Sequence, residues 1–327
     1  MKSVEIIVPC YNEEEGIDIF YEETKKITDS IKDYSFKFIF IDDGSKDKTL
    51  EKLMNLANNR DVYYISFSRN FGKEAGMYAG LKNSSADYVI IMDADLQHPP
   101  KLIIDMINGI EEGYDCVAAR RVDRKGESPV RNAFSKMFYR LSNKITDVKL
   151  ERGVVDYRIM SRQMVDAVLS LSESQRFSKG IFEWVGFKKK WIPYENVERT
   201  IGSSKWSFWS LFKYAVDGIT AFSLAPLKLV TLCGFLISFF AFIYIIATLI
   251  QTCIYGIVVP GYVTTLSAVL FLGGIIEFSI GLLGAYLGHI YVEAKDRPLY
   301  ITKYTNIDNI NSNGFDVQKG IKNGKDA

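Results

Sequence analysis

An uncharged, apolar stretch in the C-terminal third limits most strongly what this chain can fold into. No Asp, Glu, Lys or Arg occurs between residues 229 and 276. A membrane-spanning helix needs about 20 apolar residues, so this stretch and its flanks have room for two. We predict spanning helices at residues 226–252 and 262–291, and assign residues 226–292 to a transmembrane hairpin. The alternative is a buried helical hairpin of a soluble protein, although two consecutive segments of bilayer length are hard to bury.

Basic residues on both sides of the hairpin predict its orientation. The basic residues before the first span are Lys205, Lys213 and Lys228, and those after the second are Lys295, Arg297 and Lys303. The link between the two spans has no basic residue. The positive-inside rule places both flanks in the cytoplasm. Residues 1–205 are therefore expected to form a cytoplasmic domain, with no cleaved signal peptide. Residues 293–327 are expected to be a cytoplasmic tail, partly disordered because its end is polar and rich in Gly, Asn and Lys.

Two further features belong to the membrane region. Aromatic residues are mixed with charged ones over residues 206–225, which predicts an amphipathic helix in the membrane interface; an ordinary core helix is the alternative. In the second span, Gly281, Gly284 and Gly288 recur on roughly one side of the helix. Small residues at this spacing indicate close helix packing, within the hairpin or between protomers. We expect a homo-oligomer.

The N-terminal two-thirds alternates apolar strand-like runs with helix-like runs. Strands are predicted at residues 4–8, 37–41, 62–67, 88–92 and 115–119, and helices at 13–31, 47–58 and 72–82. Continuous apolar strands separated by helices indicate an α/β fold with a mostly parallel, Rossmann-like sheet covered on both faces. Such sheets bind ligands at the carboxyl ends of their strands. No G-x-G-x-x-G motif and no Walker-type lysine loop is present, so neither a dinucleotide cofactor nor a P-loop nucleotidase is expected.

Polar clusters follow three of the predicted strands. They are Pro9-Cys10-Tyr11-Asn12-Glu13, Asp42-Asp43-Gly44-Ser45 and Asp93-Ala94-Asp95-Leu96-Gln97. Two carboxylates on alternate residues can face one divalent cation, and Mg²⁺ or Mn²⁺ takes oxygen ligands. Such a cation would neutralise a diphosphate leaving group. An Asp-x-Asp pair alone is weak evidence, and its position beside the other two clusters strengthens it. The net charge of +1 gives no sign of nucleic-acid binding.

Together these segments resemble glycosyltransferase family 2, and within it the polyprenyl-phosphate glycosyltransferases, which include dolichol-phosphate mannosyltransferases and bactoprenol glucosyltransferases. The similarity covers nearly the whole chain, hairpin included. The segments that carry it are Val8-Pro9-Cys10-Tyr11-Asn12-Glu13-Glu14, Ile41-Asp42-Asp43-Gly44-Ser45, Phe67-Ser68-Arg69-Asn70-Phe71-Gly72-Lys73, Met92-Asp93-Ala94-Asp95-Leu96-Gln97-His98-Pro99-Pro100, Arg176-Phe177, Trp184-Val185-Gly186-Phe187 and Gly202-Ser203-Ser204-Lys205-Trp206. The resemblance implies an A-type glycosyltransferase fold, a multi-pass protein of the bacterial inner membrane, and a homotetramer.

The resemblance also implies which residues bind the donor. The expected nucleotide-sugar contacts are Pro9, Tyr11, Glu13, Asp42, Lys73, Asp93, Ala94 and Arg120, with Lys73 reaching the base or the ribose. The expected metal ligands are Asp93, Asp95 and Gln97, with Mg²⁺ or Mn²⁺ as the cofactor. Asp43 either assists at the nucleoside or starts the helix that follows it.

Catalysis is expected to depend on Asp156, Asp95 and Arg131. Asp156 matches the position usually assigned as the catalytic base. The acceptor is a lipid phosphate whose second pKa is about 6, so it hardly needs deprotonation. Asp156 would then orient the acceptor or the sugar hydroxyls. The alternative is that Asp156 caps a helix predicted at residues 159–169.

The acceptor phosphate is expected to meet Arg131, Arg199, Ser203 and Lys205. The last three lie just before the aromatic interfacial segment, at the depth of a lipid headgroup. Membrane-surface anchoring without catalytic contact is the alternative for them.

The implied reaction is an inverting transfer of a sugar from a UDP-sugar to undecaprenyl phosphate, which yields a lipid-linked sugar for cell-envelope glycan modification. Glucose is preferred, followed by N-acetylglucosamine, mannose and galactose. The alternative is a GDP-mannose enzyme that makes dolichol-type phosphate mannose. A processive polysaccharide synthase is less expected, because the chain lacks a Gln-x-x-Arg-Trp motif and further spans. A non-catalytic membrane sensor or scaffold would bind the donor without turnover.

Overall fold

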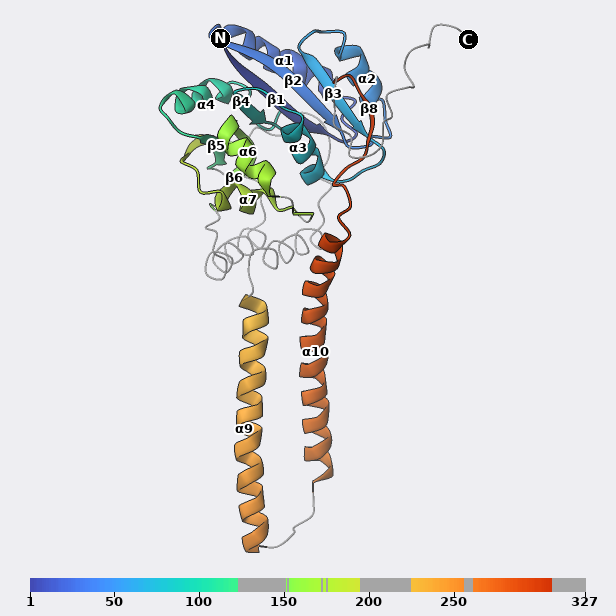
Figure 1. Ribbon diagram of the computed structural model, residues 1–327, viewed down its shortest axis with the longest axis vertical. Coiled ribbons are helices and arrows are strands. Elements are labelled where there is room, and N and C mark those ends of the chain that lie inside the picture. Colours follow the sequence, from blue (N-terminus) through green and yellow to red (C-terminus); the bar gives the residue numbers. More distant parts are fainter. Residues whose placement is uncertain are drawn as a thin grey trace, which may run out of the picture.

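The computed structural model describes residues 1–122, 151, 153–171, 173–174, 176–194, 225–255 and 261–307. The chain forms an α/β domain and a long helical hairpin that extends away from it (Figure 1). Within the described residues, eight strands form one sheet in the order β7-β5-β6-β4-β1-β2-β3-β8.

The sheet is mostly parallel, as predicted. Its strands are β1 (Lys2–Cys10), β2 (Tyr34–Asp42), β3 (Val62–Phe67), β4 (Tyr88–Ile91), β5 (Cys116–Arg121), β6 (Val154–Ser161), β7 (Lys189–Tyr194) and β8 (Thr302–Thr305). β6 pairs antiparallel with β4 and β5, and β8 pairs antiparallel with β3; the other pairs are parallel. The carboxyl ends of β1, β2, β4 and β5 therefore share one sheet edge with the amino end of β6. Distant segments of the chain meet at that edge.

Helices cover both faces of the sheet. One face packs against α1 (Ile17–Ser30), α2 (Thr49–Leu56) and α4 (Leu102–Glu111), and the other against α3 (Lys73–Lys82), α6 (Arg162–Ser170) and α7 (Ser178–Trp184). Side chains alternate along each strand, so Ile6 and Val8 enter the first core and Ile7 enters the second. Burial on both faces explains why the strands read as continuous apolar runs.

The helix predicted at residues 159–169 is wrong in its first part. β6 continues to Ser161, and α6 begins at Arg162, where the Ser161 hydroxyl accepts a hydrogen bond from the backbone N–H of Met164. Ile159 and Met160 enter opposite cores, which requires a two-sided strand rather than a helix. Asp156 therefore lies inside β6, and the helix-cap alternative for it is wrong.

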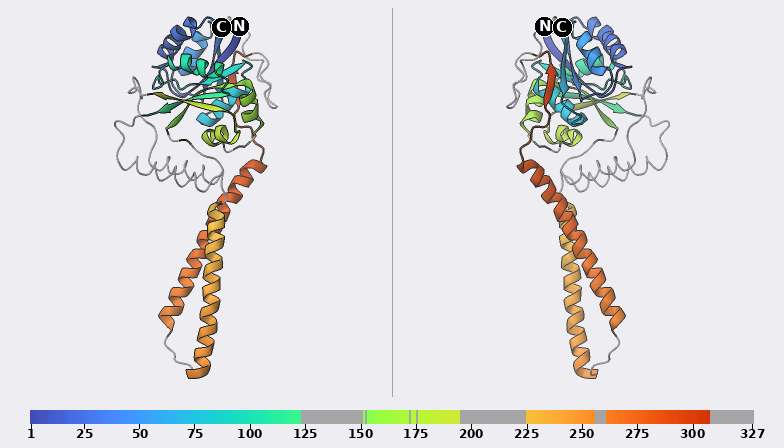
Figure 2. Two further views of the ribbon diagram at one scale, coloured as in Figure 1. Left: turned by 90° about the vertical axis from the view of Figure 1, so that its left-hand side faces the viewer. Right: turned by 90° about the vertical axis from the view of Figure 1, so that its right-hand side faces the viewer.

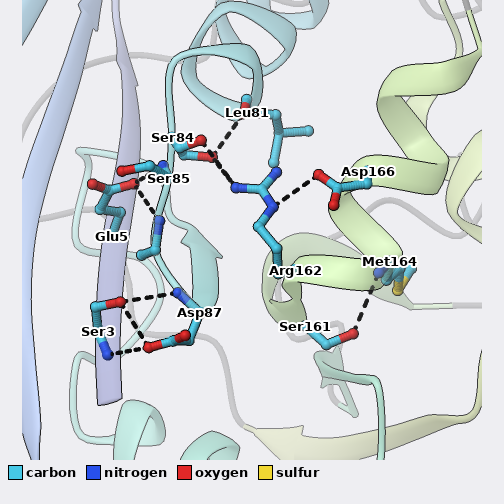
Figure 3. Close-up of polar contacts among 11 residues, drawn as sticks. Ser3, Glu5, Leu81, Ser84, Ser85, Asp87, Ser161, Arg162, Met164 and Asp166 are labelled. Atoms are coloured by element: carbon cyan, nitrogen blue, oxygen red, sulfur yellow. Dashed lines mark hydrogen bonds and ion pairs between the residues drawn. The ribbon is translucent and has the colours of Figure 1, made fainter. Parts of the chain in front are cut away.

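Polar contacts fix the loop between α3 and β4 and the start of α6 (Figure 3). The Glu5 carboxylate on β1 accepts a hydrogen bond from the Ser85 backbone N–H at 2.7 Å. The Arg162 guanidinium donates to the Ser84 carbonyl at 3.0 Å and to the Asp166 carboxylate at 2.9 Å. These contacts lie at the amino ends of the parallel strands, so they stabilise the sheet without using the edge that carries the three polar clusters.

The hairpin consists of α9 (Ala225–Tyr255) and α10 (Tyr262–Ala294). Both helices are long and apolar enough, by length and composition, to cross a membrane; the qualifying segments are Leu227–Tyr244 and Phe271–Ala294, and neither has a buried residue. They project from the α/β domain in all views (Figures 1 and 2). A buried hairpin of a soluble protein would have a covered face, so the exposure of both helices contradicts that alternative.

The chain returns to the sheet after the hairpin. β8 adds to the outer edge of β3 (Figure 1), and the backbone N–H of Ser174 donates to the Glu293 carboxylate near the end of α10 at 2.9 Å. The assignment of residues 293–327 to a tail missed this strand. The two outermost strands, β7 and β8, thus stand before and after the hairpin in the sequence. The predicted interfacial helix at 206–225 lies outside the described residues apart from Ala225, which begins α9.

Candidate functional site

The first two polar clusters are bound to each other at the sheet edge. The backbone N–H of Asn12 donates to the Ser45 hydroxyl at 2.9 Å, and the Asn12 side-chain oxygen accepts from the backbone N–H of Lys46 at 2.9 Å. Asn12 adopts a positive φ of 54°, which Asn tolerates better than most residues. The backbone N–H of Glu13 donates to the Thr49 hydroxyl at 2.8 Å. These hydrogen bonds join the loop after β1 to the loop after β2.

Asp42 and Asp43 accept hydrogen bonds that fix the neighbouring loops. The Asp42 carboxylate is buried and accepts from the Ser66 hydroxyl at 2.7 Å and from the backbone N–H of Ser45 at 3.0 Å. Both of its oxygens thus bind the chain itself, and its predicted nucleoside contact stays a prediction. Asp43 accepts from the backbone N–H groups of Phe71 and Gly72 at 2.6 and 2.9 Å, and burial raises its pKa. Asp43 therefore supports the start of α3, not the start of α2 as one alternative held.

Lys73, the first residue of α3, lies between two carboxylates. Its Nζ is 2.6 Å from Asp93 Oδ1, after β4, and 2.7 Å from Asp156 Oδ2, on β6. The exposed fractions of the Lys73, Asp93 and Asp156 side chains are 39%, 26% and 16%. The three residues come from three different elements and meet because β6 runs antiparallel to β4. We call them the Lys73–Asp93–Asp156 cluster.

Electrostatics keeps Lys73 and Asp156 ionised. Burial alone would lower the pKa of Lys73, but the carboxylates of Asp156 and Asp93 outweigh it and raise the pKa. Burial alone would raise the pKa of Asp156, but the ammonium groups of Lys73 and Lys179 outweigh it and lower the pKa. An ammonium between two carboxylates leaves one net negative charge, which a cationic ligand can neutralise.

The Asp93-x-Asp95 turn continues to a buried histidine. The backbone N–H of Gln97 donates to the Asp95 carboxylate at 3.1 Å, and Leu96 between them has a φ of 54°. The His98 ring stacks on Tyr157, with the ring centroids 5.5 Å apart. Burial lowers the pKa of His98, so its imidazole is neutral near pH 7. The sequence analysis included His98 in a segment of the resemblance but gave it no role, although a histidine directly after a candidate metal ligand was a usable signal.

The predicted metal ligands have suitable chemistry but are not preassembled. Within the described part of the chain, no three His, Cys, Asp or Glu side chains lie together as a ready metal-binding group. Asp93 Oδ1 is paired with Lys73, whereas Asp93 Oδ2 faces the Nδ1 atom of His98 at 4.0 Å. That Nδ1 is buried and has no hydrogen-bond partner in the part of the chain that the structure describes. Carboxylate oxygens and a neutral imidazole nitrogen suit Mn²⁺, so these residues fit a divalent cation that draws them together.

Buried Arg158 and half-buried Glu74 support the cluster, and the sequence analysis did not assign them a role. Arg158 donates to the backbone carbonyls of Val155 and Asp156 at 2.9 and 3.3 Å, which fixes β6 at Asp156. Glu74 accepts hydrogen bonds from the Ser178 backbone N–H at 3.1 Å and from the Ser178 hydroxyl. Glu74 therefore ties α3, which carries Lys73, to the start of α7.

Other predicted donor residues occupy the same edge. Pro9 is the penultimate residue of β1 and lies beside Gly76 of α3. Ala94 is buried, and Arg120 is exposed near the end of β5. Tyr11 is half-buried in the loop after β1. Four predicted residues lie outside the described part of the structure, and their roles stay predictions: Arg131, Arg199, Ser203 and Lys205.

Comparison with known proteins identifies the family of this domain. The sequence profile described as Glycosyl transferase family 2 matches residues 5–169, about half of the chain. The chain belongs to glycosyl transferase family 2. The family match spans β1 to α6 and includes all three members of the Lys73–Asp93–Asp156 cluster. It confirms that the chain is a glycosyltransferase and that the fold is the A-type glycosyltransferase fold.

The resemblance extends through the hairpin. A second profile, described as GtrB C-terminal hairpin, matches residues 225–290, the range of α9 and most of α10. The "Putative glycosyltransferase CsbB" of Bacillus subtilis (strain 168) is 50% identical over 94% of this chain and 93% of its own length. The "Prophage bactoprenol glucosyl transferase homolog" of Escherichia coli (strain K12) is 41% identical over 92% of this chain and 98% of its own. Catalytic domain and hairpin thus occur together in this part of family 2.

Proposed function

We propose that this enzyme transfers glucose from a UDP-sugar to a polyprenyl phosphate of the undecaprenyl type. The observation that carries the proposal is the 41% identity, over 92% of this chain, to a homolog named as a bactoprenol glucosyl transferase. That alignment is long enough to include most of the hairpin, and a hairpin of this kind would hold the enzyme at the membrane that contains a lipid-phosphate acceptor. The product would be a lipid-linked sugar for modifying cell-envelope glycans.

The arrangement of domain and hairpin supports a lipid acceptor. β1 begins at the N-terminal mark in Figure 1, on the side away from α9 and α10, and runs toward them. The carboxyl edge of the sheet, with the Lys73–Asp93–Asp156 cluster, therefore faces the hairpin side. A phosphate headgroup at the membrane surface could approach this edge without the lipid tail leaving the bilayer.

The chemistry follows from the residues at this edge. A phosphate oxygen of the acceptor attacks the anomeric carbon while the bond from that carbon to the nucleoside diphosphate breaks, which inverts the configuration. Asp93, Asp95 and Gln97 would hold a Mg²⁺ or Mn²⁺ ion, and such an ion neutralises charge on the leaving diphosphate. Lys73 holds Asp93 and Asp156 in fixed positions around the donor sugar. Asp156, kept ionised by Lys73, would orient the sugar or the acceptor by accepting hydrogen bonds.

The membrane topology and assembly belong to the same proposal. Basic residues flank the hairpin, so a multi-pass protein of the bacterial inner membrane with a cytoplasmic catalytic domain is favoured. Gly281, Gly284 and Gly288 have no neighbouring atoms within 4 Å of a Cβ built on them. That open stripe on α10 could receive a helix from a second copy, which supports a homo-oligomer.

The test is sugar transfer by the purified full-length protein in detergent. The assay contains undecaprenyl phosphate, Mg²⁺ or Mn²⁺, and one UDP- or GDP-sugar at a time, with formation of glycolipid as the readout. Product from UDP-glucose alone is the expected result. Product only from GDP-mannose would replace the proposal by the mannosyltransferase alternative. Donor binding without product from any sugar would favour the non-catalytic sensor or scaffold.

A further inference from the structure

Two buried polar atoms that have no hydrogen-bond partner among the described residues lie beside the candidate metal site. They are Nδ1 of His98 and the hydroxyl of Tyr194. The His98 side chain is only 8% exposed. Buried polar groups are nearly always paired, and an exception calls for an unobserved water or ion. His98 Nδ1 is therefore the atom in this region with the clearest need for a ligand.

The surroundings of this atom indicate a cation. Asp93 Oδ2 is its nearest charged neighbour at 4.0 Å, which is too long for a hydrogen bond. Two ligands of one octahedral cation, each about 2.1 Å from it, lie about 3.0 Å apart when adjacent and about 4.2 Å apart when opposite. The measured separation is close to that of opposite ligands. The ionisable groups that act on His98 are Asp93, Asp95, Lys73 and Asp156, and three of these four are carboxylates.

Lys73 determines which side of Asp93 faces His98. It pairs with Oδ1 of Asp93 at 2.6 Å, so Oδ2 is the oxygen on the histidine side. A cation between Oδ2 and Nδ1 would leave the pair with Lys73 intact. The His98 ring is also held in place, because it stacks on Tyr157 and meets Tyr194 edge-on with the centroids 5.7 Å apart. The imidazole therefore has a fixed direction toward Asp93.

We propose that His98 is a ligand of the divalent cation, which binds between Nδ1 of His98 and Oδ2 of Asp93. This inference rests on the metal dependence of the proposed function. A nitrogen ligand favours Mn²⁺ over Mg²⁺, because imidazole suits first-row transition metals and Mg²⁺ prefers oxygen. His98 thus sets the choice of metal, while Asp93 and Asp95 supply the charge.

The decisive measurement is pulsed electron paramagnetic resonance of the Mn²⁺-loaded full-length protein with UDP. The chain has 2 histidines, and the second, His289, lies in α10. Protein labelled with ¹⁵N-histidine should show coupling of a directly bound nitrogen to Mn²⁺. The signal should vanish in His98→Phe, which keeps a stacking ring, and persist in His289→Gln. Wild-type protein that binds Mn²⁺ without any histidine coupling would overturn the proposal.

Metal affinity gives a second readout that does not depend on turnover. His98→Phe should weaken Mn²⁺ binding by about 10- to 100-fold and weaken Mg²⁺ binding less, with an unchanged far-ultraviolet circular dichroism spectrum. Unchanged Mn²⁺ affinity in this folded variant would contradict the inference. The two proposals can fail separately. If Mn²⁺ binds to His98 but no sugar is transferred, only the proposed function is wrong. If sugar is transferred by a protein that binds no metal, only the inference about His98 is wrong.

Discussion

Nζ of Lys73 lies 2.7 Å from Oδ2 of Asp156, although 83 positions separate the two residues in the sequence. The same ammonium group contacts Asp93, so one side chain links the carboxylate expected to hold a metal with the one expected to act in catalysis. This link argues for Asp156 as an orienting group. A carboxylate held ionised by an ammonium is a poor proton acceptor, and a lipid phosphate hardly needs one.

Replacing Lys73 by Met should lower kcat/KM for glycolipid formation by about two to three orders of magnitude, because Asp93 and Asp156 would repel each other and lose their fixed positions. Lys73→Arg keeps the charge and should restore part of the activity. The measurement is the initial rate of transfer to undecaprenyl phosphate. Lys82→Met, at the other end of α3, is the matched control and should leave the rate unchanged. A Lys73→Met enzyme with wild-type kinetics would remove the cluster from catalysis.

The ion pair also predicts how stability depends on pH. The pKa of Asp156 is lowered in the folded protein, so its contribution is fully present above the unfolded value of about 3.9 and is lost as the pH falls below that value. Lys73 is partly exposed, so the pair should contribute only about 1–2 kcal/mol, between an exposed and a buried pair. The difference in unfolding midpoint between wild type and Asp156→Asn should be constant from pH 5 to 8 and shrink below pH 4. If the difference in unfolding midpoint disappeared already near pH 6, Asp156 would be taking up a proton in that range, as expected of a general base.

The part of the fold that follows from local pattern was predictable. Val62–Phe67 was predicted with the bounds that the structure gives, and β1, β2, β4 and β5 were placed within a few residues. The parallel strand β7 was not predicted. β6 was partly read as a helix because a strand buried on both faces has no period-two pattern to separate it from a buried helix. β8 has only 4 residues and is held by pairing with β3, which local sequence does not reveal.

The site was predictable in its members but not in its contacts. Because ligands of such sheets bind at the carboxyl ends of the strands, Asp93 and Asp95 were predicted at the sheet edge where the structure has them. Lys73 was expected at the nucleoside, and its ammonium lies between Asp93 and Asp156. That pairing depends on the antiparallel direction of β6, and strand direction follows from the whole topology. His98 was given no role for a similar reason, since its packing against Tyr157 on β6 and Tyr194 on β7 depends on the topology.

Asp95→Asn should abolish metal-dependent transfer while leaving the fold intact. The change removes a charge from the Asp93-x-Asp95 turn but keeps an oxygen that can accept the hydrogen bond from the Gln97 backbone N–H. Glycolipid formation at increasing Mn²⁺ concentration is the measurement, with the unfolding midpoint as the check on folding. Asp105→Asn in α4, where the side chain is exposed, is the control and should behave as wild type. Full activity with unchanged metal dependence in Asp95→Asn would exclude this residue as a ligand.

The contact between the segment after the hairpin and the sheet can be tested through Tyr300. Its ring stacks on Phe67 with the centroids 4.9 Å apart, and its hydroxyl accepts a hydrogen bond from the Asn83 side chain at 3.1 Å. Tyr300→Ala should lower the free energy of unfolding of the catalytic domain by about 2 kcal/mol, from lost apolar burial and the aromatic contact. Thermal unfolding in detergent, followed by circular dichroism, measures the shift in midpoint.

The neighbouring Ile301 provides a control for that change. Its side chain is 49% exposed, and its part in docking is through the backbone carbonyl, which accepts a hydrogen bond from Ser68 N–H at 2.9 Å. Ile301→Ala keeps this bond, so it should shift the midpoint much less than Tyr300→Ala. Equal shifts for the two variants would mean that the ring contact does not anchor the segment. A large shift for Tyr300→Ala alone would support β8 as the element that fixes α10 to the sheet, because pairing of so short a strand depends on the side-chain contacts beside it.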